Sequence, residues 1–308
     1  MKLINYNDLA RSEFKLADSH IHIDILAEKE ALTPTEIAKE ASENNVNWML
    51  LPSVSLANQE EIYDIVTNQR QVVGAYGTHP MGIESLSSNF EISEYLEDLE
   101  RLLKRPKIVA VGEIGLDYSR NPHQKGLQEE LFRQQLRLAT KCNKPVLVHS
   151  RMAGDDLIRI IKEEGNATEL KGVLHCFNGS FKDACDLLDL GFYLSFSGMI
   201  TFKRSADLRE TLKKIPLSSI LLETDAPYLT PEVRPDDLNH GPCSSTAYYR
   251  RLTPQIELNC SNSPKFLPII ACVVAKCQQV SLQSVARKTT ANFKKLFLDA
   301  AEQVSQSL

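Results

Sequence analysis

The sequence lacks a CxxC motif, a long apolar run and an excess of basic residues. It has seven cysteines among 308 residues, an odd number that does not fit a disulfide framework. We therefore expect free thiols in a reducing compartment. The N-terminal stretch lacks the basic-then-apolar pattern of a secretion signal. The apolar run 268–275 is too short to cross a bilayer. We expect a cytoplasmic protein with no membrane partner.

The charge balance excludes one class of nucleic-acid-binding protein. A formal net charge of −5 does not suit a protein that coats nucleic acid through a basic face. It does not exclude an enzyme that contacts a few phosphates, because bound metal ions supply positive charge locally. Hydrophobic residues make up 43% and charged residues 24%, which is typical of a globular protein rather than a disordered one.

Short apolar segments alternate with amphipathic ones along most of the chain. The apolar segments, which we predict to be strands, are residues 16–21, 46–54, 71–77, 107–114, 144–149, 171–175, 192–196 and 219–223. Uniformly apolar strands separated by helices indicate a parallel sheet. Eight such units predict an α/β fold of the (β/α)8 barrel class, with an open doubly wound sheet as the alternative.

The chain shows no internal repeat, low-complexity tract or clear linker, so we predict a single domain over residues 1–308. Its core is expected at about 16–298, with extra helices at 264–278 and 281–304. A variable loop at about 229–263, rich in proline and polar residues, is a candidate surface for protein partners.

Polar residues capable of binding metal fall at the ends of the predicted strands. They are His20, His22, His79, Glu113, His149, His175 and Asp225. The carboxyl ends of all strands in a (β/α)8 barrel face one rim, which carries the active site. Such a cluster without a cation would leave several polar groups poorly satisfied. The pattern therefore predicts a metal centre, and His20 and His22, two apart on an extended strand, could reach the same ion.

These residues lie in segments that resemble the TatD-type metal-dependent deoxyribonucleases of the amidohydrolase superfamily. The segments are DSHIHID at 18–24, GTHP at 77–80, GEIGLDY at 112–118, VHSR at 148–151, LHCFNGS at 174–180 and LETDAPY at 222–228. A seventh, ANFKKLF at 291–297, is similar to the family's C-terminal helix. The stretch 230–242 departs from the family's spacing, which concerns substrate choice more than metal binding.

The resemblance implies a role for each position. It implies that His20, His22 and Asp225 bind a first metal, that His149 and His175 bind a second, and that Glu113 bridges the two. His79 would be a non-ligand histidine near the scissile phosphate, and Arg151 would pair with that phosphate. Asp117 would orient a metal-binding histidine without itself binding the metal. Asp24 and Glu223 are weaker candidates for a role in the site.

The implied reaction is hydrolysis of DNA, from single strands or 3′ ends, in the manner of a 3′–5′ exonuclease. Two divalent ions would activate water, and Asp225 would accept its proton as general base. The resemblance favours Mg²⁺, whereas the histidine-rich ligand set favours Zn²⁺ or Mn²⁺. Two alternatives remain open: an ester or amide hydrolase such as a D-aminoacyl-tRNA deacylase, and a TatD-like subunit of a larger defence or repair assembly.

Overall fold

The computed structural model describes residues 15–85, 91–120, 122–165, 170–232 and 261–299. Its strands are β1 (Leu16–Asp18), β2 (Val46–Pro52), β3 (Val72–Tyr76), β4 (Ile108–Asp117), β5 (Val146–Arg151), β6 (Gly172–Leu174), β7 (Tyr193–Phe196) and β8 (Ile220–Leu222). They are hydrogen-bonded in sequential order from β1 to β8. Ser19 N of the first segment donates to Leu222 O of the last, at 2.8 Å. This sequential order of eight strands confirms the predicted (β/α)8 class.

The main helices are α2 (Ile23–Glu30), α3 (Pro34–Glu43), α4 (Gln59–Asn68), α5 (Ile92–Leu103), α6 (Lys125–Lys141), α7 (Gly154–Glu164), α8 (Phe181–Asp189), α9 (Ala206–Lys214), α12 (Leu267–Gln278) and α13 (Leu282–Phe293). Helix α3 begins at Pro34, directly after Thr33, because Thr33 and Glu36 form a reciprocal capping box. Helix α2 was not predicted. A π-helical turn, η7 (Lys294–Leu298), follows α13.

Contacts divide the described residues into two compact units, and the boundaries cut through β2 and β7. Unit 1 comprises the described parts of 1–49 and 195–293, and unit 2 comprises those of 50–194 and 294–308. The expectation of a single domain stays a prediction. The predicted variable loop lies mainly in 233–260, outside the described residues.

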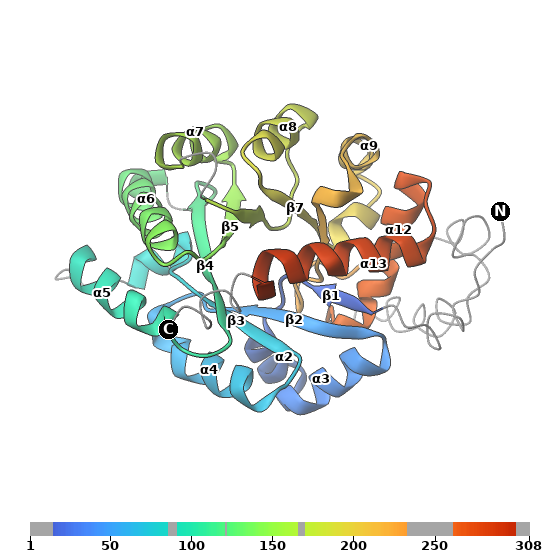
Figure 1. Cartoon of the computed structure of the whole chain (residues 1–308), viewed down its shortest axis with the longest axis horizontal. Helices are drawn as coiled ribbons and strands as arrows, with labels where there is room; N and C mark the ends of the chain where they lie inside the picture. The colour runs from blue at the N-terminus through green and yellow to red at the C-terminus, as the bar shows by residue number, and fades with distance from the viewer. Residues whose placement is uncertain (1–14, 86–90, 121, 166–169, 233–260, 300–308) are drawn as a thin grey trace. The chain divides into compact units, whose positions relative to one another are not determined.

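Unit 1 is built around β1 and β8. Helix α13 packs on both strands, and α12 packs on α13 and α9 (Figure 1). Nine of the twelve residues of α12 are buried, so this helix is core. No single helix in the described ranges is long and apolar enough to span a bilayer. The segments Pro264–Gln278 and Leu282–Leu298 would pass that test only together, across a bend of 108°.

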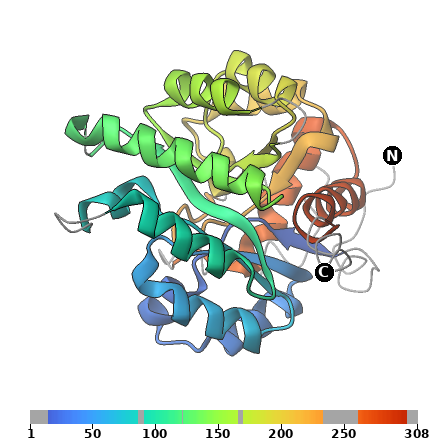
Figure 2. The same ribbon diagram turned by 60° about the vertical axis from the view of Figure 1, so that its left-hand side comes forward.

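Unit 2 carries β3 to β6 with its helices on the outside. Helix α4 packs on β3, α5 and α6 pack on β4, and α7 packs on β5 (Figures 1 and 2). All ten residues of β4 are buried, because this strand is covered on both faces. The register between β4 and β5 shifts between Val111 and Ile114, the stretch that contains Glu113. Such irregularities change the direction in which a strand's side chains point. Glu113 lies inside this shifted stretch.

The prediction that all cysteines are free is correct for the described Cys142, Cys176, Cys185 and Cys277. It is wrong for Cys272, which is disulfide-bonded. The prediction rested on an odd cysteine count and the absence of CxxC. A disulfide requires only that two cysteines lie close in space, whatever their separation in the sequence.

Candidate metal centre

Three predicted ligands lie together in unit 1 and form what we call the His20 cluster: His20, His22 and Asp225. The two Nε2 atoms of His20 and His22 are 3.1 Å apart. Each of them is 3.6 Å from Asp225 Oδ1. All three side chains are largely buried. Two imidazole nitrogens and a carboxylate oxygen therefore face one point.

The His20 cluster is held in place by a buried network between the ends of β1 and β8. Asp18 accepts hydrogen bonds from Thr224 N at 2.9 Å and Thr224 Oγ1 at 2.6 Å. Burial raises the pKa of Asp18 to about 8, and the bonds from Thr224 oppose that rise. Asp225 N donates to His20 O at 2.9 Å, and Asp225 has a left-handed backbone with φ of 56°. The backbone itself thus fixes Asp225 beside His20.

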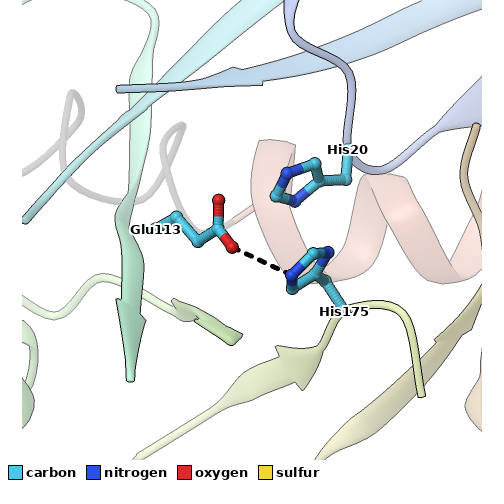
Figure 3. A group of neighbouring side chains, drawn as sticks. All are labelled: His20, Glu113 and His175. Atoms are coloured by element: carbon cyan, nitrogen blue, oxygen red, sulfur yellow. Dashed lines mark ion pairs between the residues drawn. The ribbon is translucent and has the colours of Figure 1, made fainter. Parts of the chain in front are cut away.

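Four residues form a second group in unit 2, the Glu113 cluster: His79, Glu113, His149 and His175. Glu113 Oε1 lies 2.9 Å from His175 Nε2 (Figure 3). The same oxygen is 3.1 Å from His149 Nδ1 and 3.4 Å from His79 Nε2. His149 Nδ1 and His175 Nε2 are 3.1 Å apart. One buried carboxylate oxygen is therefore surrounded by three imidazole nitrogens.

The far nitrogen of His149 contacts another acid. His149 Nε2 is 3.3 Å from Asp117 Oδ2, and Asp117 Oδ1 accepts from Ser119 N at 2.8 Å. Burial alone would raise the pKa of Asp117, but the hydrogen bonds from His149 and Ser119 outweigh it and lower that pKa. Burial lowers the pKa of His149, but its bonds to Asp117 and Glu113 outweigh this and raise it. Asp117 therefore orients the ring of His149 so that Nδ1 faces Glu113.

A glycine allows β4 and β5 to approach each other at this cluster. Gly115 pairs with His149 in the strand register and has φ of +141°. A Cβ atom at Gly115 would lie 2.0 Å from His149 O. Only glycine fits this position, which explains the second glycine of the GEIGLDY segment.

Both clusters suit a divalent cation. An ion about 2.1 Å from tetrahedral nitrogen and oxygen ligands needs those ligand atoms about 3.4 Å apart. The three pairs in the His20 cluster are 3.1, 3.6 and 3.6 Å apart. The three ligand-atom pairs among Glu113, His149 and His175 are 2.9, 3.1 and 3.1 Å apart. An ion bound between these atoms would push them slightly farther apart. Neutral imidazole with carboxylate is a donor set typical of Zn²⁺, Mn²⁺ and related ions.

The other predicted site residues differ in placement. His79 belongs to the Glu113 cluster, and its Nδ1 accepts a hydrogen bond from Met81 N at 3.1 Å. Arg151 ends β5 and its side chain is exposed. Asp24 lies in the first turn of α2, and Glu223 is fully buried after β8. Neither belongs to the His20 cluster or to the Glu113 cluster.

One positioning residue, Asn262, could not be identified from the sequence. Asn262 Nδ2 donates to Thr224 O at 2.7 Å and to Tyr228 O at 2.6 Å, which clamps the segment that carries Asp225. Asn262 is 0% exposed. It lies 37 residues after Asp225 in a polar stretch, where an asparagine resembles any loop residue.

We expect Asp117→Asn to lower metal affinity or activity by about 10- to 100-fold, the usual effect of removing a group that orients a metal-binding histidine. The amide keeps the shape but carries no charge to hold the ring of His149. Metal titration of the purified variant measures the effect. Ser119→Ala, which removes only the hydroxyl bonded to Asp117, is the milder comparison. Unchanged metal affinity and activity in Asp117→Asn would contradict this role.

Known proteins that resemble this chain over most of its length point to the same family. The model of the family described as "TatD related DNase" matches residues 17–298. An uncharacterized metal-dependent hydrolase from Buchnera aphidicola is 36% identical over 92% of this chain and 98% of its own length. The 3′-5′ ssDNA/RNA exonuclease TatD of Klebsiella pneumoniae is 33% identical over 85% of this chain and 90% of its own. The solved structure of YjjV, a TatD homologue from Escherichia coli K12, superposes with a TM-score of 0.74 at 27% identity, covering 92% of this chain and 97% of that one.

Proposed function

Because the chain belongs to the TatD-related DNase family and is a metal-dependent hydrolase, we propose that it hydrolyses phosphodiester bonds of DNA, in the manner of a 3′–5′ exonuclease. The observation that carries the proposal is the Glu113 cluster, where Glu113 Oε1, His149 Nδ1 and His175 Nε2 lie within 3.1 Å of one another. The name of the Klebsiella relative, a 3′-5′ ssDNA/RNA exonuclease, supports the choice of substrate.

We propose one divalent ion in each cluster. When bound, such ions lower the pKa of water and neutralise charge on phosphate oxygens. Mg²⁺ follows from the resemblance, and Zn²⁺ or Mn²⁺ from the imidazole-rich donors. The bridging role expected of Glu113 stays a prediction.

The protein's own groups supply the remaining chemistry. Asp225 is proposed to orient the attacking water and to accept its proton. The exposed guanidinium of Arg151 can bind a phosphate through two parallel hydrogen bonds. His79 carries its proton on Nε2, because its Nδ1 accepts from Met81 N. This N–H lies 3.4 Å from Glu113 Oε1 in the structure and would donate to the phosphate once Glu113 holds a metal ion.

Removal of metal tests this function directly. We expect a chelator to abolish cleavage of a 3′-labelled single-stranded oligonucleotide, and added Mg²⁺, Mn²⁺ or Zn²⁺ to restore it. Metal analysis of the purified protein identifies the ion, and an aminoacyl ester assayed in parallel tests the deacylase alternative. Loss of nucleotides from the 3′ end establishes polarity. Cleavage of the ester but not of DNA by the metal-loaded protein would overturn the proposal.

A further inference from the structure

A pocket of about 590 Å³ lies within unit 2, directly beside the Glu113 cluster. Its volume falls in the range of roughly 300–1,000 Å³ that is usual for small-molecule sites. His175 lines the pocket, and its Nε2 is 2.9 Å from Glu113 Oε1. A group held in the pocket would therefore be a direct neighbour of a bond cleaved at the Glu113 cluster.

The charges around the pocket do not suit a phosphate. Asp155, Asp156 and Asp183 all line it. Of the described lining residues other than His175, Lys125 alone can carry a positive charge, and its Nζ is 2.6 Å from Asp156 Oδ2. An anion in the pocket would face these carboxylates without an opposing charge. The pocket therefore disfavours an anionic occupant, and an uncharged group can enter it without electrostatic repulsion.

The remaining lining is apolar at its base and mixed at its rim. Leu174 and Phe177 are buried, whereas Met152 is 80% exposed and Asn178 is exposed. A thioether packs well against a flat ring, and a primary amide offers one acceptor and two donors to a heterocycle edge. This combination suits a flat heterocycle with a polar edge.

The backbone beside the pocket is also unusual. Met152, directly after β5, has φ of 55°, and Cys176, two residues after the end of β6, has φ of 46°. Left-handed conformations are uncommon for residues other than glycine, and they concentrate at ligand sites. These two residues place a side chain on the pocket from each strand end.

We propose that this pocket holds a nucleoside of the substrate, the base and deoxyribose adjacent to the scissile phosphate. The assignment rests on the proposed nuclease function and specifies how that site holds its substrate. The phosphate would remain at the Glu113 cluster, where a bound divalent ion would offset its negative charge. The uncharged nucleoside would extend past His175 and contact Met152 and Asn178. The enzyme would therefore distinguish a terminal nucleotide that carries a base from one that lacks it.

Filling the pocket tests the assignment. Gly154 lines it, and a Cβ atom at Gly154 would meet nothing within 4 Å, so the backbone accepts a side chain there and Gly154→Leu adds bulk at the pocket. Gly126 is the matched control, since it lies in the first turn of α6, also has open space and does not line the pocket. The substrates are two oligonucleotides that differ only in whether the terminal nucleotide carries a base or is abasic.

We expect Gly154→Leu to raise KM for the base-bearing oligonucleotide at least about fivefold, the lower end of the usual effect of losing base stacking. KM for the abasic oligonucleotide should not change, and Gly126→Leu should change neither. An equal rise in KM for both oligonucleotides in Gly154→Leu would overturn the assignment.

A binding measurement separates this inference from the proposed function. Saturation-transfer NMR with 2′-deoxyadenosine should show contacts to the base protons in the wild-type protein and in Gly126→Leu, and weaker contacts in Gly154→Leu. Wild-type protein that cleaves DNA but gives no such signal would overturn the pocket assignment alone. Wild-type protein that does not cleave DNA in the presence of metal would overturn the proposed function, and with it the nucleoside as occupant.

Discussion

Asp225→Asn is expected to lower kcat for DNA hydrolysis by about 10²- to 10⁴-fold, the usual contribution of a positioned general base. Asparagine keeps the size of Asp225 but cannot accept a proton. It also replaces the anionic oxygen that lies 3.6 Å from the Nε2 atoms of His20 and His22. Initial rates on a single-stranded oligonucleotide at saturating metal measure the effect.

Asp207→Asn is the matched control. It makes the same chemical change at an exposed aspartate of α9, which lies in unit 1 but is not part of the His20 cluster. It should retain the wild-type rate. Thermal unfolding of both variants checks that the fold persists. A wild-type kcat in metal-saturated Asp225→Asn would remove Asp225 from the reaction.

Glu113→Gln is expected to lower activity by on the order of a thousandfold, comparable with the loss of a strong electrostatic contact in an active site. Glu113 is 3% exposed, and its Oε1 is the common neighbour of His79, His149 and His175. The neutral amide removes the anion that balances a cation there. We therefore expect the metal content per chain to fall together with the rate.

The control for this change is Glu130→Gln on the exposed face of α6, which should leave rate and metal content unaffected. Elemental analysis after dialysis gives the metal content independently of turnover. Full metal content together with full activity in Glu113→Gln would contradict the assignment of Glu113 as a ligand.

Much of the fold could be predicted because the structure that the local sequence favours is also the structure that packs into the core. The capping box at Thr33 and the buried strand β4 are examples in which local sequence is sufficient. Helix α2 was missed because Ile23, Ile25 and Leu26 continue the apolar run of β1, and short apolar runs do not distinguish strand from helix. Strand β1 ends at Asp18 rather than at residue 21. At that end Ser19 N donates to Leu222 O and Asp18 accepts from Thr224, contacts that are remote in sequence.

The residue types of the two clusters could be predicted from the sequence, whereas their geometry could not, and their role as metal ligands stays a prediction. The residues of both clusters were recognised because they follow the carboxyl ends of predicted strands, and in a (β/α)8 barrel these ends face the same rim. Sequence could not show that His149 uses Nδ1 toward Glu113 and Nε2 toward Asp117, since ring orientation depends on tertiary packing. It also could not show the left-handed backbone at Met152 and Asp225, because any residue can be forced into it by its surroundings.

If a metal binds at the Glu113 cluster as proposed, the acids on either side of His149 make its uptake an exchange reaction. The carboxylates that raise the pKa of this imidazole stabilise positive charge on the ring, whether that charge is a proton or a neighbouring ion. A metal can bind only to the neutral ring, so loading must release the proton. Acidification below the raised pKa therefore favours the proton, and alkaline conditions favour the metal. Assembly of the working enzyme would thus follow the acidity of its surroundings as well as the supply of ions.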